Sequence, residues 1–398
     1  MSDVTYSELM QTTVITGIVN RQQTPLSLFQ QFFGRMSGDN SMASESAIGR
    51  VAGWDIFDAT KRFAGARAPD NGPRRVHKRR IGHQSCQLMH SHESIMILDN
   101  KVFNSRGMGN NFGSIVDPRG QQYISAQIRY MTDRYRNQRE WMYSRMLRGG
   151  FNMLPQNNGD NYVLREYDPN PTDGSFAVNY QIPNSHKGRL RIGDSGGVAT
   201  DILTDWTDPT ADIAGQLYEI NQAYTRIHGR ALKHIWINST TFNYIQNNIG
   251  LKGIGGDAFT VFSSLGRGLR QNMSREGIKD AGFCVVFRAI PLFMFHVYDG
   301  VLSSDGEMDG PSVAENALLI PDNRAIFLPD PDPEWEGLID GSEVVLPETH
   351  GEAYVAQGFA TWATRVIDPP GYELKFLDNY LPVLYIPTCV SYGDVGPF

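Results

Sequence analysis

The sequence predicts an α+β protein, and three features support this prediction. Residues 117–148 keep a helical period without a break, and about thirty residues at ~1.5 Å rise each make a rod of roughly 50 Å. Residues 84–98 alternate in part between two sets of side chains, which is typical of β-strands. The middle of the chain, residues 208–295, alternates helical segments with short apolar strands, as a compact α/β lobe does.

The first 46 residues predict an arm. They are polar except for the run at 25–33, PLSLFQQFF, which predicts a short helix. The side chains that this helix would bury are Leu28, Phe29, Phe32 and Phe33. Residues 53–100 follow as a basic stretch with little helical period, and the alternation near its end predicts a long two-stranded hairpin. The most basic run of the chain, PRRVHKRR at 73–80, lies within this stretch.

The 117–148 helix is predicted to be amphipathic. Its apolar side chains recur at a spacing of three to four residues, and they are Ile124, Ile128, Met131, Tyr135, Met142 and Met146. Much of the remaining surface is arginine, namely Arg129, Arg134, Arg136, Arg139 and Arg145. Gly149 and Gly150 end the helix, because glycine adopts left-handed backbone angles at little cost.

The middle of the chain predicts two helices and several buried strands. Asp208 is the expected N-cap, before a proline, of a helix that runs to about Ile227. An apolar strand at 234–237 and a second helix from Ser239 follow, and residues 284–295 predict one or two buried strands.

Residues 299–350 predict an acidic surface insertion. They hold 13 Asp/Glu against one cation, Arg324, and six prolines argue against long regular elements. Residues 372–392 return to the pattern of a buried strand.

Charge divides the chain into two unequal parts. Residues 1–150 carry 20 Lys/Arg and 12 Asp/Glu, a net of +8, whereas residues 151–398 carry 16 and 31, a net of −15. The sum of −7 argues against a dedicated nucleic-acid binder, because such proteins are usually basic overall. The division favours head-to-tail attraction between copies, or a nucleic-acid contact on the basic part.

Composition argues against several other classes. Cys86, Cys284 and Cys389 show no CxxC spacing, so neither a disulfide framework nor a structural zinc site is expected. The N-terminus lacks a signal-peptide pattern, and no apolar run reaches the ~20 residues of a membrane span. We therefore expect a soluble protein from a reducing compartment, with no membrane partner.

Three motifs suggest chemistry, and each has a simpler interpretation. The segment GDSGG at 193–197 resembles the nucleophile segment of trypsin-like proteases around Ser195, but no matching histidine segment precedes it, so a turn between strands is favoured over a serine hydrolase. The acidic run at 330–334 lacks the Gly and Glu positions of a calcium loop. A possible metal set has no further ligand pair to complete it, and its members are Cys86, His90, His92 and Glu93. We predict no catalytic residue, no metal and no cofactor.

The basic run at 73–80 leaves two interpretations open. As a nucleic-acid patch, it would make the chain a nucleic-acid-binding protein. As part of an arm, it would pair with the acidic surface of another copy, and we favour this because the same chain supplies the complementary charge. A long chain with no coherent catalytic site, but with an arm, a basic hairpin and a rod-like helix, indicates an assembly subunit.

Four segments together resemble one protein family. They are PLSLFQQFF at 25–33, DPTADI at 208–213, AIFL at 325–328 entered through PDN at 321–323, and the closing strand near 373–390. In order and spacing they resemble the major capsid protein of lambda-like tailed bacteriophages, which has the Hong Kong 97-like coat-protein fold. The resemblance covers most of the chain.

The resemblance implies a division of the chain. Residues 1–46 would form the N-terminal arm, and residues 47–116 would form an extended β-hairpin loop that overlaps a neighbouring subunit. Residues 117–205 would form a peripheral domain with the long helix as its spine, and residues 367–398 would add the return strand of that domain. Residues 206–366 would form an axial α/β domain, with the acidic insertion at about 299–350.

The resemblance also implies a structural function without enzymatic activity. Copies would form hexamers and pentamers and close into an icosahedral head around phage double-stranded DNA, assembled in the host cytoplasm and retained in the virion. The implied partners are a portal protein, a decoration protein, packaged DNA through non-specific contact, and a separate scaffolding protein, since no helical extension precedes residue 25. A cellular nanocompartment shell would share the fold.

We predict that contacts between subunits involve the basic run, the aromatic arm and the surface of the long helix. The residues are Arg74, Arg75, Lys78, Arg79, Arg80, Phe29, Phe32, Phe33, Arg129 and Arg136. The arginines of the helix would face neighbouring subunits or the packaged DNA.

Overall fold

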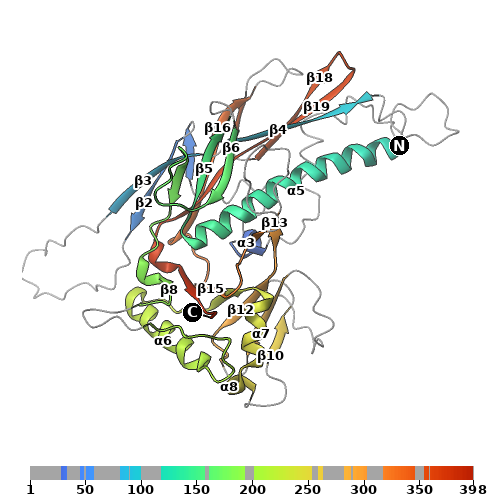
Figure 1. Ribbon diagram of the computed structural model, residues 1–398. Helices are drawn as coiled ribbons and strands as arrows, with labels where there is room; N and C mark the ends of the chain where they lie inside the picture. The colour runs from blue at the N-terminus through green and yellow to red at the C-terminus, as the bar shows by residue number, and fades with distance from the viewer. Residues whose placement is uncertain are drawn as a thin grey trace, which may run out of the picture. The chain divides into compact units, whose positions relative to one another are not determined.

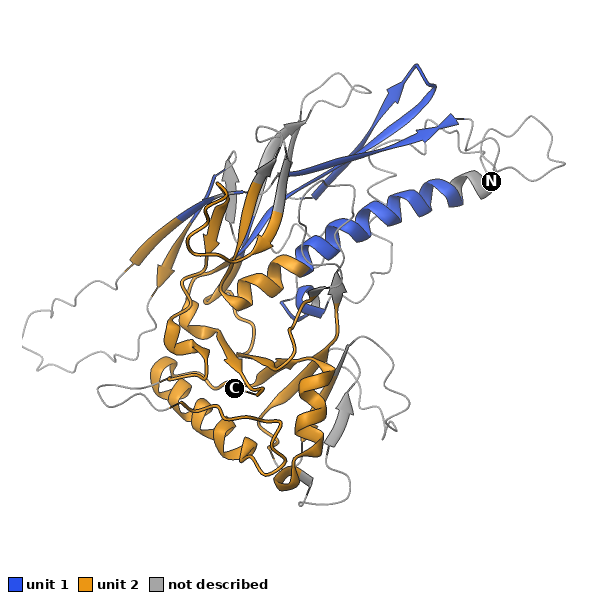
Figure 2. Ribbon diagram, in the orientation of Figure 1, with its two compact units in different colours: residues 1–53, 85–140, 338–382 blue, residues 54–84, 141–337, 383–398 orange. Residues whose placement is uncertain are grey.

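The chain passes repeatedly between two structural units (Figure 2). Unit 1 comprises residues 1–53, 85–140 and 338–382, and unit 2 comprises residues 54–84, 141–337 and 383–398. The computed structural model describes residues 28–33, 45–48, 51–57, 81–88, 90–99, 118–156, 161–192, 201–252, 259–262, 282–287, 290–302, 317–345, 354–357 and 359–397. The five-part division implied by the resemblance stays a prediction.

A six-stranded sheet and a long helix form unit 1 (Figure 1). The strands run in the order β1-β16-β19-β18, with β4 also on β19 and β17 on β16. Their bounds are β1 (Glu45–Ile48), β4 (His90–Leu98), β16 (Glu336–Val345), β17 (Tyr354–Gln357), β18 (Phe359–Val366) and β19 (Gly371–Leu384). β19 is the central strand, because β4 and β18 both pair with it in antiparallel register along residues 371–378.

The predicted long helix is confirmed as α5 (Pro118–Arg148), of which the residues up to Glu140 belong to unit 1. Its predicted apolar positions are all buried. In unit 1 they form a core with β4, β18 and β19, whose buried members are Ile97, Ile124, Ile128, Met131, Tyr135, Ala363, Tyr372, Leu374 and Phe376. The helix ends as predicted, since Gly149 has a left-handed φ of 107° and its N–H donates to the Met146 carbonyl at 3.2 Å.

The predicted arm helix is confirmed as α3 (Leu28–Phe32). A two-stranded ribbon is present in the 53–100 stretch, as predicted, but the second half of the alternating segment, residues 90–98, belongs to the six-stranded sheet. β2 (Val51–Phe57) pairs with β3 (Ile81–Gln87) as a two-stranded ribbon, whereas β4 pairs with β19. Ile97 on β4 is fully buried in the core under α5, and β3 offers little apolar surface for such a position. Burial against the helix therefore decides which partner β4 takes.

Unit 2 is built on a seven-stranded mixed sheet in the order β10-β11-β12-β9-β15-β20-β8. These strands are β8 (Lys187–Gly188), β9 (His234–Ile237), β10 (Phe259–Phe262), β11 (Gly282–Phe287), β12 (Met294–Tyr298), β15 (Arg324–Leu328) and β20 (Ser391–Asp394). Its helices are α6 (Ile213–His228), α7 (Ser239–Asn247) and α8 (Ile249–Lys252). A three-stranded antiparallel sheet has β5 (Gly150–Gln156) between β6 (Asn161–Glu166) and β7 (Phe176–Asn179), and β13 (Val301–Leu302) pairs with β14 (Ala317–Leu318).

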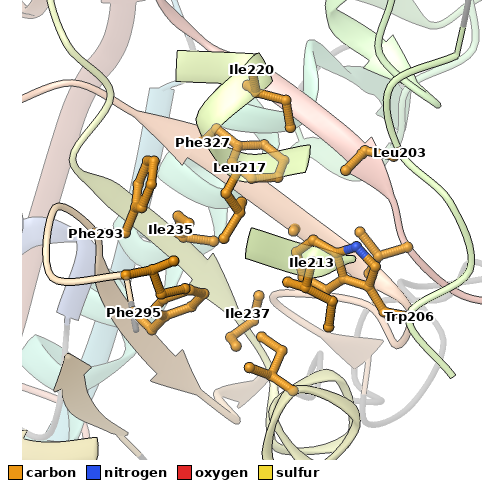
Figure 3. Close-up of a cluster of buried hydrophobic side chains, with 14 of the residues drawn as sticks. Leu203, Trp206, Ile213, Leu217, Ile220, Ile235, Ile237, Phe293, Phe295 and Phe327 are labelled. Carbon is orange, nitrogen blue, oxygen red and sulfur yellow. The ribbon is translucent and has the colours of Figure 1, made fainter. Parts of the chain in front are cut away.

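One face of the seven-stranded sheet packs against α6. Side chains at alternate strand positions point to this face, as the period of two in a β-strand requires. The core includes Ile213, Leu217 and Ile220 from α6, and Ile235, Ile237, Phe295, Val297, Ala325 and Phe327 from the strands. Figure 3 shows labelled members of this cluster gathered together.

The helix and strands predicted after residue 230 are confirmed as β9, α7, β11 and β12. The predicted start of the preceding helix, at Asp208, is wrong. Asp212 is the N-cap of α6, because its Oδ1 accepts from the Gly215 N–H at 2.9 Å. Asp208 closes a separate turn by accepting from the Thr210 N–H at 2.8 Å. Both residues are good caps by type, so the choice between them depends on tertiary packing.

The interpretation of residues 299–350 as an exposed insertion without long regular elements is wrong for residues 317–345. β15 lies inside the seven-stranded sheet with Ala325, Ile326, Phe327 and Leu328 fully buried, and β16 has 10 residues. The acidic residues of the turn between them stay half-buried or exposed, and short apolar runs between the prolines supply the strands. The charge count of the segment concealed this local alternation.

Replacing Ile128 by alanine should lower the free energy of unfolding by about 2–5 kcal/mol, because this side chain is fully buried in the core under α5 and its removal leaves a cavity. Urea titration followed by circular dichroism measures the change. Asn137→Ala, at an exposed position of the same helix, should stay within about 0.5 kcal/mol. Equal losses in the two variants would contradict the assigned core.

Candidate functional site

In the described part of the chain, the strongest candidate for a catalytic or metal centre is a chain of polar side chains in unit 2. Among the described residues, no group of three or more His, Cys, Asp or Glu is arranged to hold a metal ion. No helix in the same part of the chain is long and apolar enough to cross a membrane. Ser195 lies outside the described residues, so the arrangement around it is not part of the structure.

The polar chain joins four residues of unit 2. The Cys284 Sγ lies 3.0 Å from the His296 Nδ1, the His296 Nε2 lies 2.9 Å from the His234 Nδ1, and the His234 Nε2 lies 3.0 Å from an Asp330 oxygen. The Trp236 ring stacks on His296 with centroids 4.3 Å apart. Burial lowers the pKa values of His234 and His296 below their ordinary range.

This chain contains the residue types of a thiol nucleophile and its base, but not their accessibility. Cys284 is only 3% exposed, so its sulfur does not face solvent where a substrate would bind. Sequence reasoning missed the arrangement, because up to 96 positions separate its members. The available signal was the placement of Cys284, His296 and His234 on one face of neighbouring strands.

A buried carboxylate holds the arm helix α3 on α5 within unit 1. One oxygen of Glu140 accepts from the Phe29 N–H at 2.7 Å, and the other accepts from the Gln30 N–H and side-chain amide, each at 3.2 Å. The same amide donates to the Arg136 carbonyl at 2.8 Å. Phe29 and Phe33 are buried and Phe32 is half-buried, so these predicted contact residues are largely covered within their own chain.

Arg139, also on α5, pairs with a carboxylate inside unit 1. Its Nε donates to Asp378 Oδ2 at 2.8 Å, its Nη2 donates to the other Asp378 oxygen, and the guanidinium lies 4.4 Å from the Tyr380 ring centroid. Both side chains are buried. In unit 2, Arg145 is 1% exposed and pairs with Glu166. The expectation that the helix arginines face neighbours or DNA is therefore wrong for Arg139 and Arg145.

The two helix arginines predicted to contact other subunits lie in different environments. The Arg129 side chain is 60% exposed, beside the exposed Tyr130, and its Nε lies 3.8 Å from Asp133. Arg136 is buried, with its Nη1 3.5 Å from the same carboxylate. Arg129 is thus available to a partner in this structure, whereas the role of Arg136 between subunits stays a prediction.

Large apolar side chains are exposed on the ribbon and at a turn of unit 1. Val51 on β2 is 61% exposed and Ile81 on β3 is 59% exposed, and Ile367, between β18 and β19, is 88% exposed. Burial of such side chains against another protein is favourable by about 25 cal/mol per Å². The remaining predicted contact residues, Arg74, Arg75, Lys78, Arg79 and Arg80, belong to the 58–80 segment that joins β2 to β3 and lie outside the described residues.

Replacing Arg139 by methionine should destabilise the protein by about 3–5 kcal/mol, because the Asp378 carboxylate then stays buried without its guanidinium. Adding Asp378→Leu should restore much of the loss. Denaturant titration of both variants measures this difference. Arg165→Met, in the more exposed pair with Asp173, should cost less than about 1 kcal/mol. A single variant as stable as the unaltered chain would show that the pair is not buried as described.

No protein-family model matches the sequence, and no curated protein does. The chain is similar to several solved structures. A phage-related protein of Bordetella bronchiseptica RB50 is 10% identical with a TM-score of 0.47, and 97% of each chain is covered. The mature capsid protein chain of bacteriophage PhiM1 is 7% identical with a TM-score of 0.43, over 89% of this chain and 86% of that one.

The protein assigned as the capsid protein of an Escherichia coli CFT073 prophage is 13% identical to this chain, with a TM-score of 0.52. The likeness covers 97% of this chain and 99% of that one. At this identity the likeness concerns the fold. The predicted fold class is confirmed: the chain has an α+β, Hong Kong 97-like fold.

Proposed function

We propose that this chain is the major capsid protein of a tailed bacteriophage, a structural subunit without enzymatic activity. Its copies form hexamers and pentamers that close into an icosahedral head around double-stranded DNA. The observation that carries the proposal is the likeness to a prophage protein assigned as a capsid protein, over nearly the full length of both chains. Because a fold alone does not fix a function, the charges and surfaces of this chain supply the further support.

The division of charge supports self-association. The net of +8 over residues 1–150 and of −15 over residues 151–398 gives each copy basic and acidic segments, so that a basic segment of one copy can attract an acidic segment of another. The basic run lies between β2 and β3, whose exposed apolar residues Val51 and Ile81 suit a contact with a second chain. We assign the ribbon and the run that it carries to one inter-subunit contact, with Arg129 as part of another.

The arm helix raises a specific requirement. Since Phe29 and Phe33 are covered within their own chain, they contact another subunit only if α3 of one copy docks on α5 of a neighbour in the place that it occupies here. Such an exchange of identical elements costs little, because the same contacts form in either case. We retain Phe29, Phe32 and Phe33 as contact residues on this condition.

The proposal includes partners beyond other copies of the chain. A scaffolding protein would act during assembly in the host cytoplasm, a portal protein would occupy one vertex, and a decoration protein would bind the outer surface. Packaged DNA would be met through non-specific charge contacts in the virion.

Replacing Arg74, Arg75, Arg79 and Arg80 by glutamate should leave the subunit folded and block shell formation. The run then changes from five cations to one cation and four anions, so it repels the acidic surface that it would otherwise meet. Circular dichroism checks the fold, and negative-stain electron microscopy of the concentrated protein shows whether particles form.

The matched control replaces the same four arginines by lysine, which keeps the charge and should keep the particles. Normal particles from the glutamate variant would refute the proposed role of the run. A wild-type subunit that forms no rings or shells, but binds DNA with a steep dependence on salt, would favour the nucleic-acid-binding alternative instead. Shells that enclose protein and no DNA would indicate a nanocompartment.

A further inference from the structure

The polar chain of unit 2 lies on the face of the seven-stranded sheet opposite to α6. Ile235, Phe295 and Val285 point toward the core with α6, so the alternate residues of the same strands point the other way. Cys284 is the direct cross-strand partner of His296, and His296 is the partner of Trp236. Three neighbouring strands, β11, β12 and β9, thus place a thiol and two imidazoles side by side.

When both imidazoles are neutral and Cys284 is a thiol, one arrangement of hydrogen atoms satisfies all three of these hydrogen bonds. The carboxylate of Asp330 only accepts, so His234 must carry its proton on Nε2 and accept on Nδ1. His296 must then donate from Nε2 to that Nδ1, and it must accept on its own Nδ1. The Cys284 thiol supplies that last donor. All three hydrogen bonds therefore run in the same direction, from the buried sulfur to the exposed carboxylate.

An added proton weakens this arrangement, because the direction of two hydrogen bonds must reverse. A proton on His234 Nδ1 would face the His296 Nε2–H across 2.9 Å, so two donors would oppose each other. If His296 moved its proton to Nδ1, that N–H would meet the thiol hydrogen of Cys284. The thiol hydrogen would then have to turn away, and the sulfur would become the acceptor of this hydrogen bond. Sulfur is a weaker acceptor than the imidazole nitrogen that accepts in the neutral state.

The charged residues near the chain do not offer another acceptor to the two opposed imidazole N–H groups in the hydrogen bonds given for them. Among the described residues, the Lys233 ammonium, just before β9, hydrogen-bonds to the same Asp330 that receives His234. Arg230 pairs with Asp332 and Glu334 on the same turn as Asp330. Glu219 and Arg226 belong to α6, on the other face of the sheet. Two further titratable groups lie at the end of β12: the Tyr298 ring centroid is 6.3 Å from that of Trp236, and Asp299 accepts from the Ser239 N–H at 2.7 Å.

We propose that Cys284, His296, His234 and Asp330 form a proton-responsive latch. While both imidazoles are neutral, the latch ties β11, β12 and β9 to the turn after β15. When the chain takes up a proton, the hydrogen bond between His296 and Cys284 weakens and the centre of the sheet loosens. The inference concerns unit 2 of a single chain and does not rest on the proposed capsid function.

The direction of the pH effect follows from burial. Desolvation lowers the pKa values of His296 and His234, so the unfolded chain, with an ordinary histidine pKa of 6.5, binds protons first as the pH falls. The folded state loses no stability to these groups above pH 6.5 and loses it progressively below. His186 contributes in the same direction, since burial lowers its pKa to about 4, and it must be separated from the latch by experiment.

The tautomers provide the first test. Long-range proton–nitrogen spectra of the full chain, labelled at histidine, distinguish an imidazole protonated on Nε2 from one protonated on Nδ1 or on both. At neutral pH, His234 and His296 should both be neutral and protonated on Nε2, with resonances assigned by His234→Gln and His296→Gln. A Nδ1-protonated or positively charged ring at either position would overturn the proposal.

Acid titration provides the second test, with Trp236 as the local probe. Tryptophan emission should fall reversibly as the pH is lowered below 6.5, before the helix signal is lost, because an imidazolium stacked on an indole quenches it. Trp236→Phe should remove this change. His234→Gln, which keeps polar atoms but does not titrate, should shift the midpoint by about half a pH unit or more.

The matched controls are His186→Gln, a buried histidine outside the latch, and His83→Gln, whose side chain is 68% exposed. Both should keep the fluorescence change at its original midpoint. If His186→Gln moves the midpoint as far as His234→Gln does, or if His234→Gln leaves it in place, the latch is refuted. Should His234→Gln fail to fold, the spectra of the unaltered chain still decide.

Discussion

Burial of one apolar face of α5 is the constraint on which unit 1 depends. Ile124, Ile128, Met131 and Tyr135 from the helix meet strands that come from residues 90–98 and 359–384. The Tyr135 hydroxyl connects two of these strands, because it accepts from the Glu93 N–H and donates to the Phe376 carbonyl, both at 3.0 Å. A single helix face thereby fixes the register of segments far apart in the chain, which neither strand could do alone.

The same helix neutralises charge within the chain and leaves other charge exposed. Asp378 fixes Arg139, and Glu140 is used to hold α3, so these buried groups stabilise a particular arrangement and are not available to partners. Arg129 and Tyr130 remain at the surface of the helix. An assembly subunit needs both kinds of position, since a rigid interior presents exposed residues in a fixed geometry to its neighbours.

Periodicity predicted the elements, and packing decided their ends and partners. The six apolar positions of α5, the strand at 234–237 and the short helix at 28–32 could be read from spacing, because each buries one continuous face. The pairing of β4 with β19 could not, since it depends on a partner almost 300 positions away, as in Phe376 with Glu93. The burial of Arg139 could not be predicted from the sequence either, because the spacing of the arginines is the same whether their side chains contact a carboxylate or solvent.

The candidate site shows the same division. Cys284, His234 and His296 each have an ordinary place in an apolar strand, and only the order of strands in the sheet brings them together. The sequence carried the charge division and the family resemblance, which point to assembly, while the polar chain is a product of topology. A search for motifs along the sequence therefore misses sites whose residues belong to different, neighbouring strands.

Sedimentation velocity of the full chain over a range of concentrations, with electron microscopy of the fast fraction, tests the central claim most directly. An assembly subunit should pass from monomer to five- and six-membered rings or closed shells of uniform size as the concentration rises. A chain that stays monomeric at every concentration, or that forms only irregular aggregates, would contradict the account.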